Sequence, residues 1–388
     1  MSEARKSNFN YPCDYRLGAG RRSELAELCF ERGIRRPLVV TDGGVRALEW
    51  FEPLMQLLSS AGLEASVFSE IRSNPIGEEV DAGVQVFLEN QCDGVILIGG
   101  GSAMDVGKCI ALVADNPGNV FDYEDVGDNF QRADPEKIAP MIALPTTSGT
   151  GSEVGRASVI VNQQKEKKII FHPKMQPADV IADPELTVAL PASLTAFTGV
   201  DAYTHCFEAW CARGYHPMAD GIALEGMRLI KEYLPAAVAN GGDIEARTHM
   251  IVASSMGATA FQKGLGAVHA ISHALGAKLN VHHGLANAIV LPYCMVFNRS
   301  AIEERCFVLA RHLGLEEPSF AALLRWTVEF REQLGIPHTL KDVPMMNGAM
   351  AKELAPLAHV DAALSGNPKE ATVKDLEDIM LAAFEGRL

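Results

Sequence analysis

The chain has 388 residues and a net charge of −15, from 34 Lys and Arg against 49 Asp and Glu. Its length exceeds the usual size of one domain, so two domains are expected. The acidic excess argues against nucleic acid or an anionic membrane as the main partner, because neutralising phosphates needs clustered basic residues.

Targeting signals and cysteines point to the cytoplasm. The amino-terminal residues Met-Ser-Glu-Ala-Arg-Lys-Ser-Asn lack the apolar run of a signal peptide. No segment approaches the ~20 consecutive apolar residues that span a bilayer. Eight scattered cysteines without a Cys-x-x-Cys pair are typical of reduced thiols in a reducing compartment.

Short apolar runs alternate with amphipathic stretches in the first half of the chain. Strands are expected at residues 37–42, 64–68, 94–98, 140–144 and 179–182. A helix is expected at residues 78–88, between the second and third of these strands. Such alternation predicts a parallel sheet covered by helices on both faces.

The loop after the third strand is rich in glycine. Ligands of such sheets bind at the carboxyl ends of the strands, and this strand leads into Gly99-Gly-Gly-Ser-Ala-Met-Asp-Val-Gly-Lys108. Glycines let the backbone approach a phosphate closely, and the free N–H groups of the following helix stabilise its charge. The loop departs from the common Gly-x-Gly-x-x-Gly pattern, because Ala103 and Met104 replace the last glycine. A tight turn explains the glycines equally well.

A second loop and one carboxylate complete a candidate nucleotide site. Leu144-Pro-Thr-Thr-Ser-Gly-Thr-Gly-Ser-Glu153 follows the next strand. Alone it could be a solvated loop, but two such loops at successive strand ends could grip a pyrophosphate from two sides. Asp42 could accept hydrogen bonds from a ribose diol, and its charge would repel a 2′-phosphate, which favours NAD over NADP. Turn chemistry in Asp-Gly-Gly is the alternative for Asp42.

The pattern changes from mixed to helical near residue 187. Asp183-Pro-Glu-Leu-Thr-Val-Ala-Leu-Pro191 ends the sheet part. We therefore expect an α/β domain over residues 1–187 and an all-helical domain over residues 188–388. Helices are expected at residues 194–211, 218–238, 244–262, 267–279, 285–298, 307–313, 321–334 and 373–384. Turns are expected at Gly241-Gly242 and His282-His283-Gly284.

The stretch from Asp201 to His283 contains candidate metal ligands. Asp201 and His205 are four residues apart, so they share one face of a helix, and the mostly apolar sequence around them predicts that this helix is buried. His269 and His273 have the same spacing on a second helix.

Two more histidines, His282 and His283, follow in the expected turn. One carboxylate and up to three imidazoles could converge on one ion, and this set suits Fe(II), Zn or Mn. A single histidine on an apolar helix is more often a hydrogen-bonded core residue. Five histidines and an aspartate in one stretch, with two i,i+4 pairs, favour a metal.

These motifs resemble those of the iron-containing (group III) alcohol dehydrogenases, which include lactaldehyde and 1,3-propanediol reductases. The resemblance runs through almost the whole chain and is carried by Gly99 to Lys108, Pro145 to Glu153, Asp183-Pro-Glu-Leu186, Asp201-Ala-Tyr-Thr-His205, Gly264 to His273, His283-Gly-Leu-Ala-Asn287 and Asn367-Pro368. It implies a Rossmann-like α/β NAD-binding domain followed by an all-α metal-binding domain, the architecture of dehydroquinate synthase.

The resemblance also implies roles for single residues. The metal ligands would be Asp201, His205, His269 and His283. His273 would lie beside the substrate without binding the ion, and it would pass a proton to solvent; His282 would be spare. The cofactor contacts would be Asp42, Asn74, Gly99, Gly100, Gly101, Ser102, Asp105, Thr146, Thr147, Ser148, Gly149, Thr150 and Lys167. For the lysine run 165–168, a solvated hairpin face is the alternative.

A few positions set this chain apart from the family pattern. Gly155 stands where members commonly have Thr, which predicts fewer contacts to the nicotinamide. Ala260 and Ala363 replace larger side chains near the expected substrate pocket, which predicts a roomier pocket. Lys263 lies six residues before His269. It either binds a carboxylate of the substrate or is a surface lysine at a helix end.

The activity implied by the resemblance is reversible hydride transfer between C1 of a primary alcohol and C4 of the nicotinamide of NAD. A divalent ion, Fe²⁺ before Zn²⁺ or Mn²⁺, would bind the hydroxyl group and lower its pKa. An ω-hydroxy acid such as 4-hydroxybutyrate is an alternative substrate. A lyase resembling dehydroquinate synthase would call for several Lys and Arg beside the metal ligands, which are lacking there. A nucleotide-binding sensor without catalysis is a third hypothesis.

The quaternary structure follows only by analogy. Dimers of the family suggest that the Tyr11 to Arg16 segment pairs with a second copy at a sheet edge. We therefore expect a homodimer or larger homo-oligomer, with no nucleic-acid or membrane partner.

Overall fold

The protein is described by a computed structural model over residues 13–388. Tyr11 and the amino-terminal residues considered above for targeting lie outside this range. Within it the chain forms two compact units. The sheet unit comprises residues 13–190 and 241–251, and the helical unit comprises residues 191–240 and 252–388.

The sheet unit contains a six-stranded, entirely parallel sheet in the order β1-β8-β5-β4-β2-β3. Its strands are β1 (Asp14–Leu17), β2 (Pro37–Val40), β3 (Ser66–Phe68), β4 (Gly94–Gly99), β5 (Met141–Pro145) and β8 (Asp179–Ala182). A separate antiparallel hairpin is formed by β6 (Ala157–Val161) and β7 (Lys167–Phe171). The predicted parallel sheet is confirmed. Residues 14–16 of the segment expected at a sheet edge belong to β1, whose pairing with β8 was not expected.

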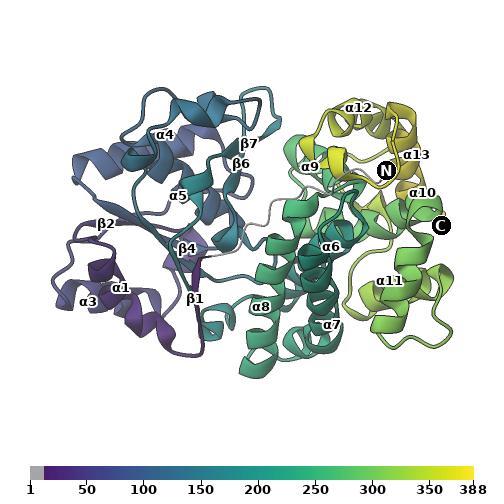
Figure 1. Cartoon of the computed structure of the whole chain (residues 1–388), viewed down its shortest axis with the longest axis horizontal. Helices are drawn as coiled ribbons and strands as arrows, with labels where there is room; N and C mark the ends of the chain where they lie inside the picture. Colours follow the sequence, from purple (N-terminus) through teal and green to yellow (C-terminus); the bar gives the residue numbers. More distant parts are fainter. Residues whose placement is uncertain (1–12) are drawn as a thin grey trace, which may run out of the picture. The chain divides into compact units, whose positions relative to one another are not determined.

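Helices cover both faces of this sheet. They are α1 (Leu25–Glu31), α2 (Gly43–Arg46), α3 (Phe51–Ser60), α4 (Gly77–Glu89) and α5 (Gly101–Val113). Figure 1 shows α1 and α3 on one face and α4 and α5 on the other. A Cβ at Gly107 would lie 2.2 Å from Leu97 Cδ2, so the glycine lets α5 pack closely against β4. The C-terminal ends of β2, β4 and β5 thereby present Asp42 and the two glycine-rich loops at one edge.

The Asp183-Pro-Glu-Leu motif fastens the end of β8 to the start of the chain. The Asp183 carboxylate is fully buried and accepts hydrogen bonds from the backbone of Gly20, Arg22 and Glu185. It also forms an ion pair of 2.9 Å with the Arg22 guanidinium. A buried carboxylate needs such a complete set of partners, so this motif has a structural role in the sheet unit.

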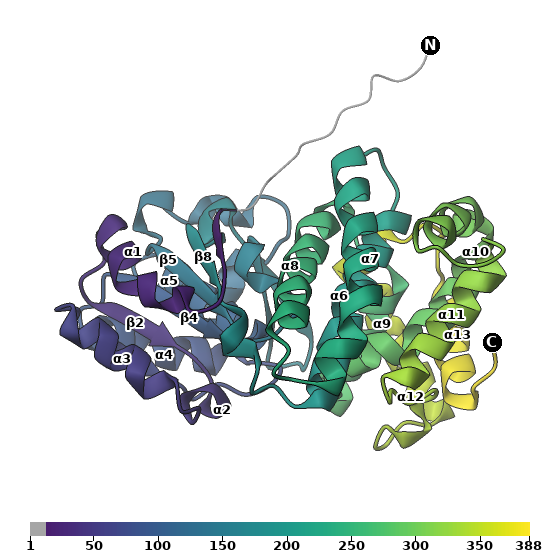
Figure 2. The same cartoon turned by 90° about the horizontal axis from the view of Figure 1, so that it is seen from below.

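The helical unit contains the helices of the second half of the chain (Figure 2). They are α6 (Ala192–Cys211), α7 (Pro217–Ala239), α9 (Ala267–Leu279), α10 (His283–His312), α11 (Phe320–Gln333), α12 (Gly348–His359) and α13 (Val373–Glu385). Helix α8 (Ile244–Ala260) begins in the sheet unit and ends in the helical unit. The helix α12 was not expected.

Two predicted boundaries in this unit are wrong. The expected helices 285–298 and 307–313 are one continuous helix of 30 residues, α10. The polar run between them does not break it, because Arg299 and Glu303 form an ion pair of 2.9 Å at i,i+4 spacing on its exposed side. His283 and Gly284 start this helix and do not form a turn.

Helix α10 is also long and apolar enough, by length and composition, to cross a membrane. However, 67% of the apolar stretch is buried within the protein, as in the core helix of a globular fold. Pro292 interrupts its hydrogen bonding and leaves the Ala288 carbonyl without its usual N–H donor. The buried Arg331 of α11 donates to the carbonyls of Ala288 and Ile289 at 2.7 and 2.8 Å and so replaces the lost donor.

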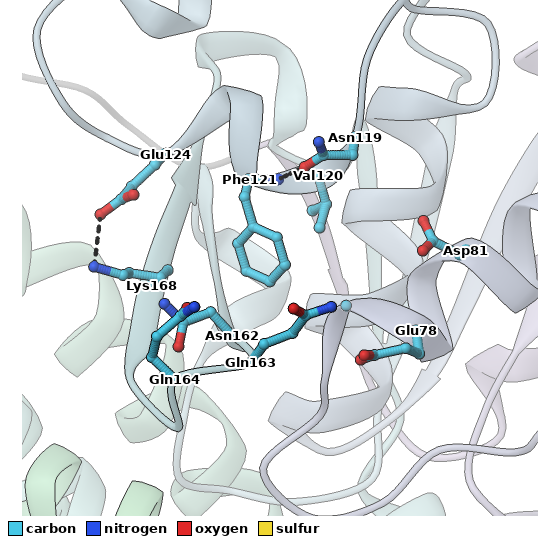
Figure 3. A pocket seen from close by; sticks show the side chains of 11 residues that line it. Glu78, Asp81, Asn119, Val120, Phe121, Glu124, Asn162, Gln163, Gln164 and Lys168 are labelled. Atoms are coloured by element: carbon cyan, nitrogen blue, oxygen red, sulfur yellow. Dashed lines mark hydrogen bonds and ion pairs between the residues drawn. The ribbon is translucent and has the colours of Figure 1, made fainter.

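A cavity of about 410 Å³ opens in the sheet unit beside the first turn of α4 (Figure 3). Glu78, Phe121 and Lys168 are among the residues that line it. Several of its polar groups already serve the protein itself. Lys168 lies 3.4 Å from Glu124, and Asn119 caps the turn at Phe121. The cavity contains none of the residues predicted to contact NAD.

Candidate metal centre

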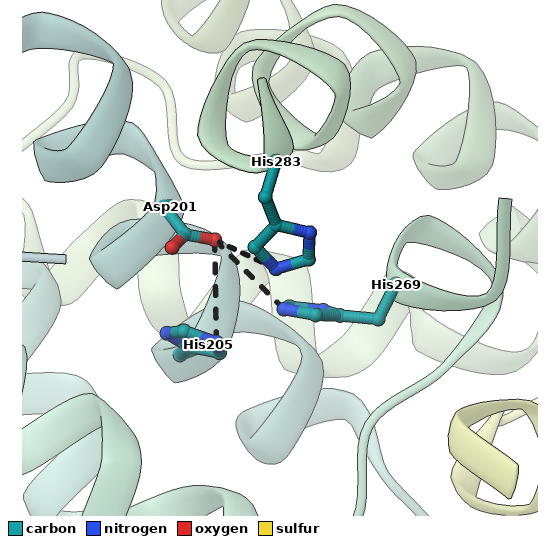
Figure 4. A group of neighbouring side chains, drawn as sticks. All are labelled: Asp201, His205, His269 and His283. Atoms are coloured by element: carbon teal, nitrogen blue, oxygen red, sulfur yellow. Dashed lines mark ion pairs between the residues drawn. The ribbon is translucent and has the colours of Figure 1, made fainter. Parts of the chain in front are cut away.

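Four side chains from three helices converge in the helical unit (Figure 4). Asp201 and His205 lie one turn apart on α6, where both are buried as predicted. His269 comes from α9, and His283 is the first residue of α10. One possible ligand atom from each lies within 4.8 Å of all the others.

The spacing of these atoms suits one ion. Asp201 Oδ1 lies 4.0, 3.9 and 3.7 Å from the Nε2 atoms of His205, His269 and His283. An ion about 2.1 Å from each atom of a tetrahedral set would hold those atoms roughly 3.4 Å apart. The distances from Asp201 to the three histidines exceed this value by less than an ångström, and no two of the four atoms are more than 4.8 Å apart.

Hydrogen bonds on the far side of two imidazoles decide which nitrogen faces the cluster. His269 Nδ1 lies 2.5 Å from Glu208 Oε2, and His283 Nδ1 lies 3.0 Å from Ser272 Oγ. With Nδ1 occupied, Nε2 of each ring is left to face Asp201. This arrangement is the usual one for histidines that bind a metal.

The Asn287 amide lies directly against the cluster. Its Nδ2 donates to Asp201 Oδ1 at 2.7 Å and lies 3.2 Å from Nε2 of both His269 and His283. The Asn287 Oδ1 is buried and has no hydrogen-bond partner within the described part of the chain. A partially positive N–H group among converging electron pairs reduces their mutual repulsion.

The remaining two histidines lie outside the group of four. His273 Nδ1 is 2.9 Å from Asp361 Oδ2, and its ring stacks on that of His283 with centroids 5.3 Å apart. Burial alone would raise the pKa of Asp361, but the charge and hydrogen bond of His273 hold that pKa below its ordinary value. His282 packs its ring against Phe197. Both histidines therefore lie outside the group of four, and the role of His273 in proton transfer stays a prediction.

Lys263 is not the surface lysine expected as one of its two alternatives. Its side chain is only 2% exposed, so it is not a surface lysine. Its Nζ lies 2.5 Å from Asp220 Oδ1 and 3.2 Å from the Trp210 carbonyl oxygen. Arg305 also contacts Asp220, at 3.4 Å. Lys263 therefore belongs to a partly buried ion-pair network, in which its ammonium already has the Asp220 carboxylate as a partner.

We expect Lys263→Met to destabilise the protein without changing substrate preference. Removing the Lys263 ammonium leaves the Asp220 carboxylate with the longer contact to Arg305, at 3.4 Å, so we expect a cost of about 2 kcal/mol. Urea unfolding measures this cost. The double variant with Asp220→Asn should recover part of it. A changed ratio of kcat/KM between a hydroxy acid and a plain alcohol would contradict the assignment.

The two glycine-rich loops of the sheet unit touch each other. A Cβ at Gly100 would lie 3.1 Å from Thr147, and one at Gly101 would lie 2.7 Å from Thr150. Gly99 has φ of +153°, a conformation that favours glycine. These glycines therefore permit loop-to-loop contact as well as a close approach to a ligand.

Two features of these loops fit an anionic nucleotide. Within the described residues, the N-terminus of the 13-residue helix α5 has no side-chain cap, and such a terminus attracts phosphate. The buried Ser148 hydroxyl has no partner among the described residues. Gly149 and Ser102 lie in the same two loops, and their contact with NAD stays a prediction.

Asp105 and Lys108 hold the second loop against α5. The Asp105 carboxylate accepts from Ser152 Oγ at 2.6 Å and from the Val159 backbone at 3.0 Å. The fully buried Lys108 ammonium donates to the carbonyls of Ser152 and Ala157. Burial lowers the pKa of Lys108. Both side chains therefore have internal partners, and any contact of Asp105 with NAD stays a prediction.

The other predicted cofactor residues lie in three places. Asp42 caps α2, with Oδ1 accepting from the backbone of Gly44 and Val45 at 2.9 and 3.0 Å, which is the turn chemistry considered above. Its Oδ2 lies beside Gly99. Asn74 follows β3 with φ of +55°.

Lys167 begins β7 of the hairpin. Its neighbour Lys168 pairs with Glu124 and Glu166 at 3.4 and 3.2 Å. Successive residues of a strand point to opposite faces, so Lys167 and Lys168 point to different sides of the hairpin.

At Gly155 the backbone is extended, and an added Cβ would meet nothing closer than 3.6 Å. A side chain could be accommodated there. Ala260 and Ala363 are both buried.

Several residues around the cluster were not singled out from the sequence. Glu208 follows His205 by three residues, so its spacing on α6 was a usable signal. Asn287 is the last residue of the motif His283-Gly-Leu-Ala-Asn287, but no role was predicted for it. Asp361 gave no local signal, because it is 88 residues from the histidine that it contacts.

Comparisons with known proteins cover nearly the whole chain. Residues 12–184 match the family model of iron-containing alcohol dehydrogenases, and residues 195–384 match the model of the C-terminal part of that family. A crystal structure of a 1,3-propanediol oxidoreductase matches with a TM-score of 0.91 and 32% identity, covering 97% of this chain and 100% of that one.

Two curated enzymes are similar over almost their full length. The 4-hydroxybutyrate dehydrogenase of Cupriavidus necator is 39% identical over 369 residues, which cover 92% of this chain and 95% of that protein. The NAD-dependent methanol dehydrogenase of Bacillus methanolicus is 36% identical over 390 residues, which cover 97% and 100%. The sequence motifs, the parallel sheet followed by helices and these matches agree, and the chain belongs to the iron-containing alcohol dehydrogenase family.

Proposed function

We propose that the protein is an NAD-dependent alcohol dehydrogenase that transfers hydride reversibly between a primary alcohol and NAD. The observation that carries this proposal is the convergence of Asp201, His205, His269 and His283. A relative named as NAD-dependent supports the choice of cofactor. The family and the donor set favour Fe²⁺, and Zn²⁺ or Mn²⁺ would also suit one carboxylate with three imidazoles.

Each part of the protein has a task in this proposal. A divalent ion held by the four ligands would lower the pKa of a substrate hydroxyl and, in the reverse direction, polarise an aldehyde. The two glycine-rich loops and the α5 N-terminus bind the pyrophosphate of NAD. His273, oriented by Asp361, passes the hydroxyl proton toward solvent.

The second candidate substrate is an ω-hydroxy acid such as 4-hydroxybutyrate. It is favoured by the 39% identity to a 4-hydroxybutyrate dehydrogenase. Because Lys263 is engaged by Asp220, this hypothesis requires another group to bind the carboxylate. Plain alcohols and diols make no such demand.

A substrate screen tests both candidates. The protein is loaded anaerobically with Fe(II), with Zn(II) in parallel, and NADH formation is followed with ethanol to hexanol, 1,3-propanediol and 4-hydroxybutyrate. Preference for an alcohol or diol supports the first candidate, and preference for 4-hydroxybutyrate supports the second. An absence of turnover with every substrate under both metals would contradict the dehydrogenase assignment.

We expect Asp42→Ser to raise the use of NADP relative to NAD by roughly tenfold to a hundredfold. The substitution removes a negative charge that would repel a 2′-phosphate, while the serine hydroxyl can still cap α2. The ratio of kcat/KM for the two cofactors measures the change. Asp42→Ala, which removes charge and cap together, separates this effect from a loss of helix α2. An unchanged ratio in both variants would place the ribose elsewhere.

We further propose that the protein is a cytoplasmic homodimer. Each chain would divide near residue 187 into a nucleotide-binding part and a metal-binding part. All eight cysteines are free thiols, as expected in a reducing compartment. Strand β1 lies at the edge of the sheet, with β8 as its partner on one side, and such an edge can accept a strand from a second copy. Light scattering and cell fractionation test these points.

A further inference from the structure

We propose that Glu208 is a positioning residue that fixes the tautomer of His269 and thereby sets the affinity of the site for its ion. The inference rests on the proposed function in one respect: it takes the Asp201 cluster as a metal site. It assigns a role to a buried carboxylate that does not itself belong to the group of four.

The position of Glu208 follows from the spacing on α6. It lies three residues after His205 and seven after Asp201, so all three side chains project from one face of the helix. The Glu208 side chain is only 6% exposed. A carboxylate so deeply buried requires charged or N–H partners, and both of its oxygens have one.

Both partners belong to the start of α9. Glu208 Oε2 lies 2.5 Å from His269 Nδ1, and Oε1 accepts from the Val268 backbone N–H at 2.8 Å. The first N–H groups of a helix have no partner within the helix and attract negative charge. A Cβ at Gly266 would lie 2.9 Å from Oε1, so this glycine lets the carboxylate approach.

The chemistry of the contact determines where the His269 proton resides. A neutral imidazole carries one N–H, and an ionised carboxylate can only accept. Glu208 therefore holds the proton on Nδ1 and leaves the Nε2 electron pair directed at the cluster, 3.9 Å from Asp201 Oδ1. The negative charge also makes the imidazole a stronger donor to a cation.

The same helix provides a matched control. His273, one turn after His269, makes the same kind of contact through Nδ1, with Asp361 at 2.9 Å. His273 is not one of the four converging residues. A change in the tautomer of His273 should therefore leave metal affinity unaltered, whatever it does to turnover.

The experiment compares Glu208→Gln with Asp361→Asn. In E208Q the amide oxygen can keep the Val268 bond, and the amide NH₂ then faces His269 Nδ1. This favours the tautomer with the proton on Nε2, which cannot bind an ion. Metal-free protein is titrated with Zn(II) against a chelator, and the visible spectrum is recorded with Co(II).

We expect E208Q to bind Zn(II) roughly 10- to 100-fold more weakly than the wild type and to alter the Co(II) bands. D361N should stay within about twofold of the wild type and keep the bands, as expected for a histidine that is not a ligand. Wild-type affinity in E208Q, or an equal loss in both variants, would overturn the proposal. The proposal would also be overturned if E208Q lost the same thermal stability with and without metal while its affinity for Zn(II) stayed at the wild-type value.

A measurement on the wild type covers the case in which E208Q does not fold. Selective ¹⁵N labelling of histidine in the metal-free protein reports which ring nitrogen of His269 carries the proton. A proton on Nε2 contradicts the inference. A failure of the proposed function would give a different result. The wild type would then bind no metal at this site, and Asp201→Ala would not change its metal content.

Discussion

Asp201→Ala is expected to remove the bound metal and to lower kcat/KM for alcohol oxidation by at least roughly a thousandfold, or about 4 kcal/mol. Asp201 supplies the only carboxylate in the group of four, and its Oδ1 lies 3.7 to 4.0 Å from the Nε2 atoms of all three histidines. Without it, three neutral imidazoles would have to hold a divalent cation in a buried site with no charged group in direct contact with the ion. Metal content per chain and steady-state kinetics measure both effects.

The neighbouring histidine His282 offers the control. It adjoins His283 in sequence but packs against Phe197 outside the group of four, so His282→Ala should retain its metal. If Asp201→Ala bound metal normally and still lost activity, Asp201 would act on the substrate and not on the ion. If His282→Ala lost metal as well, the ligand set would have to be revised.

The second large effect is expected at Gly284. A Cβ there would lie 2.4 Å from the Phe197 carbonyl oxygen and 2.8 Å from its carbon. These are backbone atoms of α6 that cannot rotate away, so Gly284→Ala must push the start of α10 from α6. We expect a loss of about 3 kcal/mol in unfolding free energy, and weaker metal binding because His283 moves with the helix.

Gly221 in α7 is the matched control for this substitution. An added Cβ at Gly221 meets nothing within 4 Å, so Gly221→Ala should stabilise its helix by about 0.5–1 kcal/mol. Denaturant unfolding of both variants, with and without Zn(II), gives the comparison. A Gly284→Ala protein as stable as the wild type would mean that the two helices can separate at little cost.

The sheet could be predicted from the sequence to a large extent, because the strands β2, β4, β5 and β8 are short buried apolar runs. Strand β1 was not predicted from its local pattern, for a physical reason. Its sequence, Asp-Tyr-Arg-Leu, is partly exposed at the sheet edge. Its partner β8 begins at Asp179, far away in the chain, so no local pattern identifies it.

The metal cluster could be predicted only in part. The i,i+4 spacing found Asp201 with His205 and His269 with His273, but it did not decide which of His269, His273, His282 and His283 bind the ion. The choice among these depends on how α9 and α10 pack, and only the family resemblance selected His269 and His283. The structure then placed His283 at the start of a helix where a turn was expected.

Most of the features that could not be predicted from the sequence depend on contacts between residues far apart in the chain. The ion pair of Lys263 could not be predicted because its partner Asp220 is 43 residues away. The burial of Lys263 and the contact between His273 and Asp361 depend on helix packing. Helical periodicity gives no information about such pairs.

The division of the chain also limits how the protein can be dissected. Within the described residues the chain passes between the two units after residues 190, 240 and 251, and the last crossing falls inside the unbroken helix α8. The segment 241–251 carries Arg247, whose buried guanidinium donates to the carbonyls of Gly241 and Leu190. A gene fragment ending near residue 190 would lack this segment. A single cut therefore cannot yield two self-sufficient halves for separate expression.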